Sequence, residues 1–292
     1  MGIFQAIVMG IVQGLTEFLP VSSSGHLSIF KNILGVETDT GLLFDVLLHV
    51  ATLVAVFIAF YKDVIRLIVE FLVIVKDGCI NLVRFFKNLT AKNKQEYIDV
   101  TSTSYKKFVI MLLISTLVTG VIGVLLKDVV DSVSSNLLVT GICLLGTGVI
   151  LILSDYIAEG HKKPKDAGLL DAAGIGAVQG VATLPGISRS GSTIVACMLF
   201  GFDRRFAVKY SFIMSMPAIL GAMILEIKDV DTSLISGSDV LAYIIGMIFA
   251  GAVGYVAVKL MVKVVLNKYF KYFAFYCFAI GAISVIAYIV ML

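Results

Sequence analysis

The sequence predicts an all-α integral membrane protein with an inverted-topology repeat, six transmembrane helices and two re-entrant helical hairpins. Hydrophobic residues make up 59% and charged residues 15% of its 292 positions, and the mean hydropathy is +1.01; soluble domains are far more polar. The stretch from Gln13 to His26 recurs from Gln179 to Ser192. The net charge of +3 lies in the loops, which fits membrane orientation and not nucleic-acid binding.

The apolar runs fall into two length classes. A helix needs about 20 apolar residues to cross a bilayer, and runs of that length lie at about 42–61, 107–126, 136–155, 207–226, 240–262 and 271–291. Shorter runs flank each copy of the repeated stretch, at 3–16, 27–34, 168–184 and 193–202. These short halves predict re-entrant hairpins at 1–41 and 168–205, because irregular backbone at membrane depth is tolerated when protein or a wet cavity surrounds it. A single kinked spanning helix in each place is the alternative.

The Lys and Arg residues of the loops predict the orientation. The segment 62–107 is rich in both and is expected in the cytoplasm, with about 64–87 as an amphipathic helix along the interface. The acidic links 127–135 and 227–239 are expected outside. Lysines at 162–165 and the pair Arg204 and Arg205 return the chain to the cytoplasm. The first hairpin then starts and ends outside and the second inside. Repeats 1–160 and 168–292 are therefore inverted within one membrane domain, with a ligand site where the broken helices meet.

The two copies share an opening Gln-Gly and a closing Ser-x-Ser-Gly. Ser and Gly after a break are typical helix N-caps, and the exposed N–H groups of a helix N-terminus attract anions. The predicted phosphate-binding residues are Ser22, Ser24, Gly25, Ser188, Ser190, Gly191 and Thr193. Arg189 adds a guanidinium, which suits a forked grip on phosphate. Each loop alone is also explained by ordinary capping.

The first copy adds Glu17, Ser23 and His26. A carboxylate can hold a divalent cation against phosphate oxygens, a hydroxyl can attack phosphorus, and an imidazole can move a proton. Gln13, four residues before Glu17, shares its helix face and is the second candidate metal ligand. A charge at mid-bilayer costs about 2.5–3.5 kcal/mol, so Glu17 and Arg189 are expected to neutralise each other through a shared phosphate and metal.

Three simpler interpretations of these polar residues stay open. Glu17 alone could serve as an ion relay, and a lone His in an apolar protein is more often hydrogen-bonded than catalytic. Asp45 and His49, four apart at the start of the next helix, either line the mouth of the site or form a structural pair.

At these residues the sequence closely resembles the undecaprenyl-diphosphate phosphatase family, also known for bacitracin resistance. The family's (Glu/Gln)-x-x-x-Glu motif is matched by Gln13 and Glu17, and its Ser-Ser-x-Gly-His element by residues 22–26. Its Pro-Gly-x-Ser-Arg-Ser-x-x-Thr motif is matched from Pro185 to Thr193. The order of the motifs extends the resemblance over essentially the whole chain.

The resemblance implies removal of the terminal phosphate from undecaprenyl diphosphate, giving the monophosphate carrier reused in peptidoglycan synthesis. It implies a divalent cation, Mg²⁺ or Ca²⁺, and a polyprenyl tail among apolar helices. Glu17, Ser23, His26 and Arg189 correspond to the functional residues, with Ser23 the usual candidate nucleophile. It further implies a bacterial cell membrane, with the site facing the outer side. A homodimer is left open.

Two other classes of membrane protein share features with this sequence. Ser23 to His26 is similar to the PSGH element of acid phosphatase-like lipid phosphatases, but Val195 stands where that class needs His. The alternative from another class is a transporter or flippase of a polyprenyl phosphate or other anionic lipid, because inverted repeats with broken helices are typical of transporters. A carrier needs an anion site but neither a nucleophile nor a proton shuttle.

Overall fold

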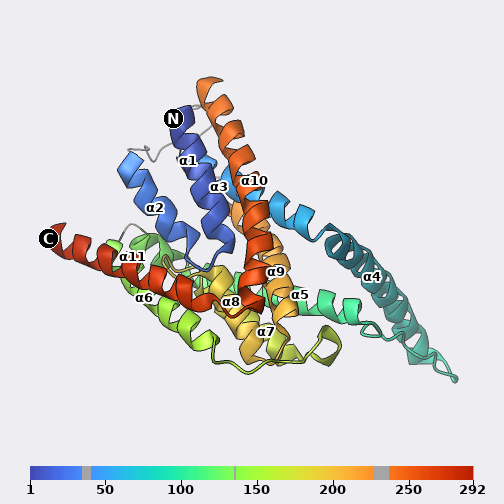
Figure 1. Ribbon diagram of the computed structural model, residues 1–292. Helices are drawn as coiled ribbons and strands as arrows, with labels where there is room; N and C mark the ends of the chain where they lie inside the picture. Colours follow the sequence, from blue (N-terminus) through green and yellow to red (C-terminus); the bar gives the residue numbers. More distant parts are fainter. Residues whose placement is uncertain (35–40, 135, 227–236, 292) are drawn as a thin grey trace.

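The computed structural model describes residues 1–34, 41–134, 136–226 and 237–291 and is all-helical there (Figure 1). The helices are α1 Ile3–Phe18, α2 Ser23–Leu34, α3 Gly41–Ala59, α4 Tyr61–Thr90, α5 Ser104–Val133, α6 Leu137–Ser154, α7 Leu169–Val181, α8 Arg189–Leu199, α9 Arg204–Glu226, α10 Gly237–Leu266 and α11 Phe270–Met291. A 3₁₀ turn, Pro164–Asp166, precedes α7. Asp229 and Asp231 of the predicted outer link lie outside the described residues.

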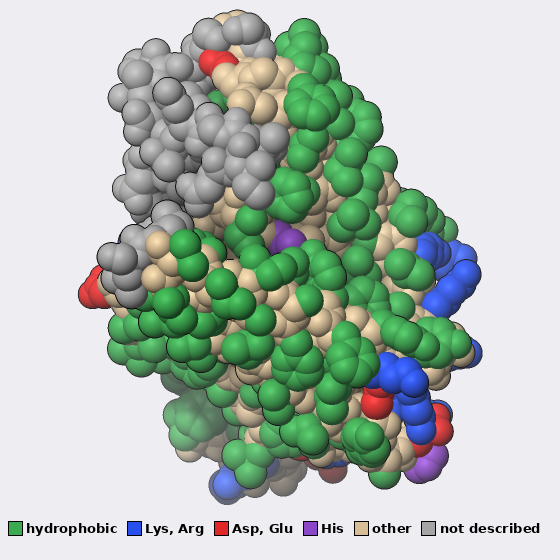
Figure 2. Space-filling model, turned by 60° about the vertical axis from the view of Figure 1, so that its left-hand side comes forward, with side chains coloured by type: hydrophobic (Ala, Val, Ile, Leu, Met, Phe, Trp, Pro, Cys, Tyr) green, Lys and Arg blue, Asp and Glu red, His purple; other side chains and the backbone are tan. Residues whose placement is uncertain are grey.

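Within the described residues, five helices are long and apolar enough to cross a membrane: α5, α6, α9, α10 and α11. They correspond to five of the six predicted spans. The sixth, 42–61, is α3, which ends at Ala59 and bends by 91° into α4. Counting that bent pair as one broken span gives six. Hydrophobic side chains cover most of the face in Figure 2, with Lys and Arg gathered toward one side and the lower edge. The protein is therefore a multi-pass membrane protein.

Helix α4 covers the predicted amphipathic segment and is longer than predicted. It extends away from the other helices in Figure 1, and 30 residues of helix span roughly 45 Å. Apolar side chains at helical spacing stay exposed along it, among them Ile65, Ile68, Leu72, Leu82 and Phe86. Its polar side is held by other segments: Lys106 donates to the Asp77 carboxylate at 2.6 Å, and Asn81 bonds the backbone of Ile98. The helix thus keeps one apolar face free along its length.

The two short helix pairs, α1–α2 and α7–α8, are hairpins. The halves of each pair contact each other. Each break contains a residue in the left-handed region, Ser22 (φ 70°) in the first and Gly186 (φ 92°) in the second. A side chain at Gly186 would also collide with the Thr140 carbonyl. Glycine adopts this conformation without strain at the second break, whereas Ser22 does not, so the first reversal depends on packing.

Each hairpin packs mainly on a helix from the other half of the chain. Helix α1 lies against α10, and α7 lies against α5. At the first contact a Cβ on Gly10 would come within 2.3 Å of the Gly246 carbonyl oxygen, and at the second a Cβ on Gly176 would come within 2.6 Å of the Ser115 carbonyl oxygen. Only glycine allows backbones this close. The two contacts correspond, because Gly10 and Gly176 occupy equivalent places in the two copies.

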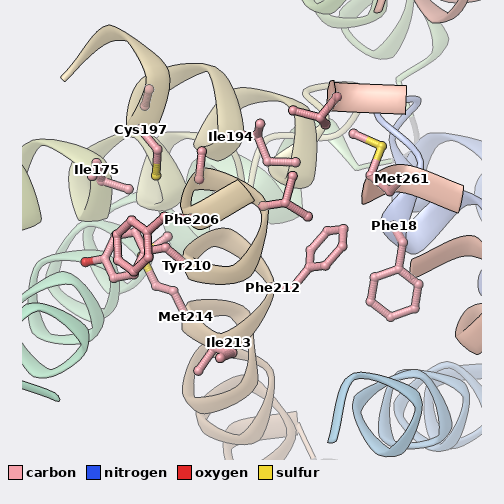
Figure 3. Close-up of a cluster of buried hydrophobic side chains, with 14 of the residues drawn as sticks. Phe18, Ile175, Ile194, Cys197, Phe206, Tyr210, Phe212, Ile213, Met214 and Met261 are labelled. Carbon is pink, nitrogen blue, oxygen red and sulfur yellow. The ribbon is translucent and has the colours of Figure 1, made fainter. Parts of the chain in front are cut away.

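The buried core surrounds α9 and joins the hairpins to the long helices (Figure 3). Phe18, the last residue of α1, meets Phe212 of α9 with ring centroids 5.4 Å apart. Ile194 of α8 and Ile175 of α7 belong to the same cluster. The ends of both hairpins are therefore fixed against one helix, which holds their polar tips in place.

Candidate active site

A cavity of about 360 Å³ lies where the tips of the two hairpins meet. Its polar lining comes from both copies: Glu17, Ser22, Ser23 and Ser24 from the first, and Gln179, Ser188, Arg189 and Ser190 from the second. Apolar side chains of α3, α5 and α9 complete the wall, including Val46, Val130, Ile219 and Met223. A polar end beside an apolar wall suits a ligand with a charged head and a hydrocarbon tail.

Glu17 is the centre of the polar end. It is 4% exposed, and its Oε2 accepts hydrogen bonds from Ser23 Oγ at 2.7 Å and from Gln13 Nε2 at 3.1 Å. Its Oε1 forms an ion pair with the Arg189 guanidinium. Glu17 and Arg189 thus neutralise each other by direct contact in this structure; the expected shared phosphate and metal stay a prediction. A direct pair forms because the crossed packing brings the two tips within contact distance.

Serines flank Ser23 and Arg189 at the start of the second half of each hairpin. Ser188 Oγ accepts from the Gly191 N–H at 3.1 Å and caps α8. The Ser22 and Ser24 hydroxyls are 3.3 Å apart, and so are those of Ser188 and Ser190. All four of these serines line the cavity, as predicted for phosphate-binding residues.

Three other predicted phosphate-binding residues lie behind the cavity lining. Thr193 is 1% exposed, donates to the Arg189 carbonyl at 2.8 Å and contacts the Ser211 hydroxyl at 2.6 Å. Gly25 and Gly191 face neighbouring side chains, Thr140 and Pro20 respectively. In this structure the three residues shape the loops that present the serines.

His26 faces α11. Its Nδ1 hydrogen-bonds the Ser22 carbonyl at 2.8 Å and its Nε2 the Tyr276 hydroxyl at 2.7 Å, with the two rings stacked 5.5 Å apart. The ring is 4% exposed and is not part of the described cavity lining. In this structure His26 therefore supports the turn at Ser22, and its part in the chemistry stays a prediction.

His49 lies in the cavity with its Nε2 3.7 Å from Glu17 Oε2. Its Nδ1 bonds the backbone carbonyl of Asp45 at 2.8 Å, so the contact within this pair uses the Asp45 main chain. Of the two interpretations left open from the sequence, the structure places His49 in the lining of the site.

The cavity is also lined by Thr119, Gln179 and Thr183 and by an apolar wall that includes Val130 and Met223. None of these residues was predicted as part of the site. Gln179 and Thr183 lie in the repeated stretch, and that position was the available signal. Thr119, Val130 and Met223 come from helices that reach the cavity only through tertiary packing.

The oxygen atoms around Glu17 could bind one divalent cation together with a ligand. The described residues hold no group of three or more His, Cys, Asp or Glu side chains that could bind a metal by themselves. Gln13 Nε2 donates to the Glu17 carboxylate, and Gln13 Oε1 is buried without a hydrogen-bond partner. Two protein oxygens with phosphate oxygens and waters are a usual magnesium environment. The residues present therefore fit the predicted cation.

The helices and the cavity define a multi-pass membrane protein with a Glu–Arg ion pair in a cavity that also has an apolar wall. Comparison with known proteins gives the family: the model for "Bacitracin resistance protein BacA" matches residues 6–283, and the chain belongs to that family. Proteins named undecaprenyl-diphosphatase are similar over most of their length. That of Treponema denticola is 44% identical over 267 residues, 91% of this chain and 90% of the relative. That of Methanosphaera stadtmanae is 40% identical over 263 residues, 90% of each.

Proposed function

We propose that this protein hydrolyses undecaprenyl diphosphate to undecaprenyl phosphate and phosphate, and so contributes to bacitracin resistance and carrier recycling for peptidoglycan synthesis. The family and the names of the relatives support this substrate. The single observation that carries the chemistry is the Ser23 hydroxyl on the Glu17 carboxylate, in one cavity with Arg189. A nucleophile, a proton acceptor and a phosphate-binding cation in one place are what phosphoryl transfer requires.

In the proposed mechanism, substrate binding replaces the Glu17–Arg189 ion pair with a contact between Arg189 and the substrate. The guanidinium that pairs with Glu17 in the absence of ligand turns to the terminal phosphate, and this frees the carboxylate. Ser23 Oγ attacks the terminal phosphorus and gives its proton to Glu17. The bond to the bridging oxygen breaks, and undecaprenyl phosphate leaves with the electron pair. Water then attacks the phosphoserine, Ser23 Oγ leaves with its electron pair and takes the proton back from Glu17, and dihydrogen phosphate departs.

Three further roles complete the proposed site. A divalent cation, Mg²⁺ or Ca²⁺, held by Glu17 and Gln13 would neutralise charge on the diphosphate. The hydroxyls of Ser22, Ser24, Ser188 and Ser190 would donate to phosphate oxygens. His26 is expected to take part in proton movement, in which case its ring must leave Tyr276 during the reaction cycle.

We also propose the re-entrant, inverted-repeat arrangement with six spans. Its support is the correspondence of the α1–α10 and α7–α5 contacts and the bend of 91° between α3 and α4. A spanning α3 followed by such a bend lays α4 flat along the bilayer surface, where its exposed apolar face enters the lipid.

The cavity is proposed to open on the outer side of a bacterial cell membrane. Val46 lies near the start of α3, whereas Val130 and Met223 lie near the ends of α5 and α9. With residues 62–107 and 162–165 in the cytoplasm by the positive-inside rule, all three positions are at the outer ends of their helices. The mouth then faces the side on which the diphosphate is released.

The second candidate function is transport of an anionic lipid. The corresponding contacts of the two hairpins favour it, because paired broken helices are typical of transporters. Ser23 on Glu17 distinguishes the two functions, since a carrier has no use for an activated hydroxyl.

The test is phosphate release from undecaprenyl diphosphate by the purified, detergent-solubilised protein, with divalent cation and with chelator, for the native protein and for Arg189→Ala. We expect cation-dependent release that Arg189→Ala loses. An intact native protein that releases no phosphate would rule out the phosphatase, and a lipid-flipping assay in vesicles would then test the transporter.

A further inference from the structure

The strongest unassigned feature is a buried hydrogen-bond acceptor in the cavity lining. Gln179, near the end of α7, is 1% exposed and lines the cavity, yet its Oε1 has no hydrogen-bond partner. A buried amide oxygen without a donor is unfavourable. It therefore indicates a ligand group that the protein itself does not supply.

The orientation of the amide follows from its neighbour. Thr119 Oγ1 gives its single hydrogen to the Gly176 carbonyl at 2.9 Å, so it can only accept from Gln179, whose Nε2 lies 3.3 Å away. A flipped amide would set Oε1 against an oxygen with no hydrogen left to give. Thr119 thus fixes the amide with its oxygen away from α5.

The missing partner must be a hydrogen-bond donor. The terminal phosphate of a diphosphate presents mainly acceptor oxygens, and its counterparts in the cavity are donors, namely Arg189 and the serine hydroxyls. The Gln179 amide oxygen is an acceptor among these donors, and a water molecule suits it. The water donates a hydrogen bond to the amide oxygen, and a lone pair of the water oxygen points at phosphorus. Glutamine in other phosphoryl-transfer sites orients an attacking water in this way.

We propose that Gln179 positions the water that completes the reaction, and that Thr119 orients Gln179. The inference rests on the proposed phosphatase function. The water oxygen forms the new bond to phosphorus, the bond to Ser23 Oγ breaks with its electron pair on that oxygen, Ser23 regains its proton from Glu17, and both water protons leave with phosphate. The repeat-related Gln13 also has an unpaired Oε1, but its Nε2 is turned to Glu17. The two glutamines therefore have different roles: Gln13 contacts Glu17, and Gln179 is held by Thr119.

The test is rapid-mixing kinetics on the purified full chain with undecaprenyl diphosphate and Mg²⁺, following lipid monophosphate and phosphate separately. Gln179→Met keeps the length of the side chain and removes the acceptor. We expect it to release a first equivalent of lipid monophosphate within about twofold of the native rate, while steady-state phosphate release falls about 10²-fold, within the range for positioned proton-transfer groups. Gln179→Glu keeps an oxygen and should recover part of the loss.

Thr119 gives a second, independent variant. Thr119→Val removes the oriented acceptor without changing the size of the side chain and should slow phosphate release in the same selective way, whereas Thr119→Ser should not. Gln95→Met, in an exposed loop, controls for the substitution itself. The proposal would be overturned if the Gln179 and Thr119 variants released lipid monophosphate and phosphate with equal slowing. An unchanged rate of phosphate release, or a higher Mg²⁺ concentration needed for activity, would also overturn it. A native protein without phosphate release would instead reject the phosphatase function.

Discussion

Hairpin α1–α2 and hairpin α7–α8 can be compared residue by residue, because a constant shift in numbering aligns their sequences. They share the glycine contact to a long helix of the other half and the pair of serine hydroxyls 3.3 Å apart. They differ in the residue between those serines, which is Ser23 in the first and Arg189 in the second. In the proposed mechanism, these equivalent positions hold the nucleophile and the cation that binds its target. Packing and loop shape are common to both copies, and the chemistry depends on their difference.

The largest expected effect is the loss of Ser23. Ser23→Ala should lower phosphate release at least about 10⁴-fold, because the attacking oxygen is gone. His26→Ala, measured beside it, should cost less, since His26 lies against Tyr276 and not in the cavity lining. Near-native turnover by Ser23→Ala together with an inactive His26→Ala would exclude Ser23 as the obligatory nucleophile.

The next effect concerns the proton acceptor of the first hairpin. Glu17→Gln keeps the shape of the side chain but cannot take the Ser23 proton, so turnover should fall by about 10²–10⁴-fold. Its counterpart in the second hairpin is Thr183, whose hydroxyl donates to the Gly180 carbonyl at 2.8 Å. Phosphate release at saturating substrate measures the effect. An equal loss in Thr183→Val would show that these positions act through loop shape alone.

Stability should depend on the pair that joins the hairpins. Arg189→Ala leaves Glu17 buried without its cation, which should destabilise the fold by about 3–5 kcal/mol. The double variant Arg189→Ala with Glu17→Gln should regain most of that loss, because the uncompensated charge is gone. Thermal unfolding in detergent checks both, and an additive loss in the double variant would contradict the direct pair.

The two glycine contacts should respond alike. Gly10→Leu and Gly176→Leu each force apart backbones in close contact and should each cost about 1–3 kcal/mol. Gly120→Leu is the matched control, because nothing lies within 4 Å of a side chain added there. A loss at one of the two sites alone, read from the same unfolding experiment, would show that the contacts are not equivalent.

The smallest effect concerns the helix cap. Ser188→Ala removes the acceptor of the Gly191 N–H and should cost about 0.5–2 kcal/mol. Phosphate release should fall only modestly, since four other serines line the same end of the cavity. A loss as large as that of Arg189→Ala would give Ser188 a role beyond capping.

Composition and apolar length predicted five of the spans, and the repeated stretch predicted the hairpins and the meeting of Glu17 with Arg189, because these features are local or follow from a repeat. The direct ion pair, the ring of His26 on Tyr276 and the place of His49 beside Glu17 could not be predicted. Each depends on which helices pack side by side, and α11 and α3 carry no mark of that in their sequences. The end of the α3 span near 61 and the amphipathic helix along the interface after it were predicted, because charges begin at Lys62 and Asp63; the angle of 91° between α3 and α4 was not.

The crossed contacts of α1 with α10 and of α7 with α5 set an order for biosynthesis. A ribosome releases α1 early, but its packing partner is complete only when Leu266 has been made. Until Arg189 has been made, Glu17 also lacks its ion-pair partner. Neither half of the chain can mature by itself, and separately produced halves 1–160 and 168–292 should regain the fold only when they meet in the same membrane.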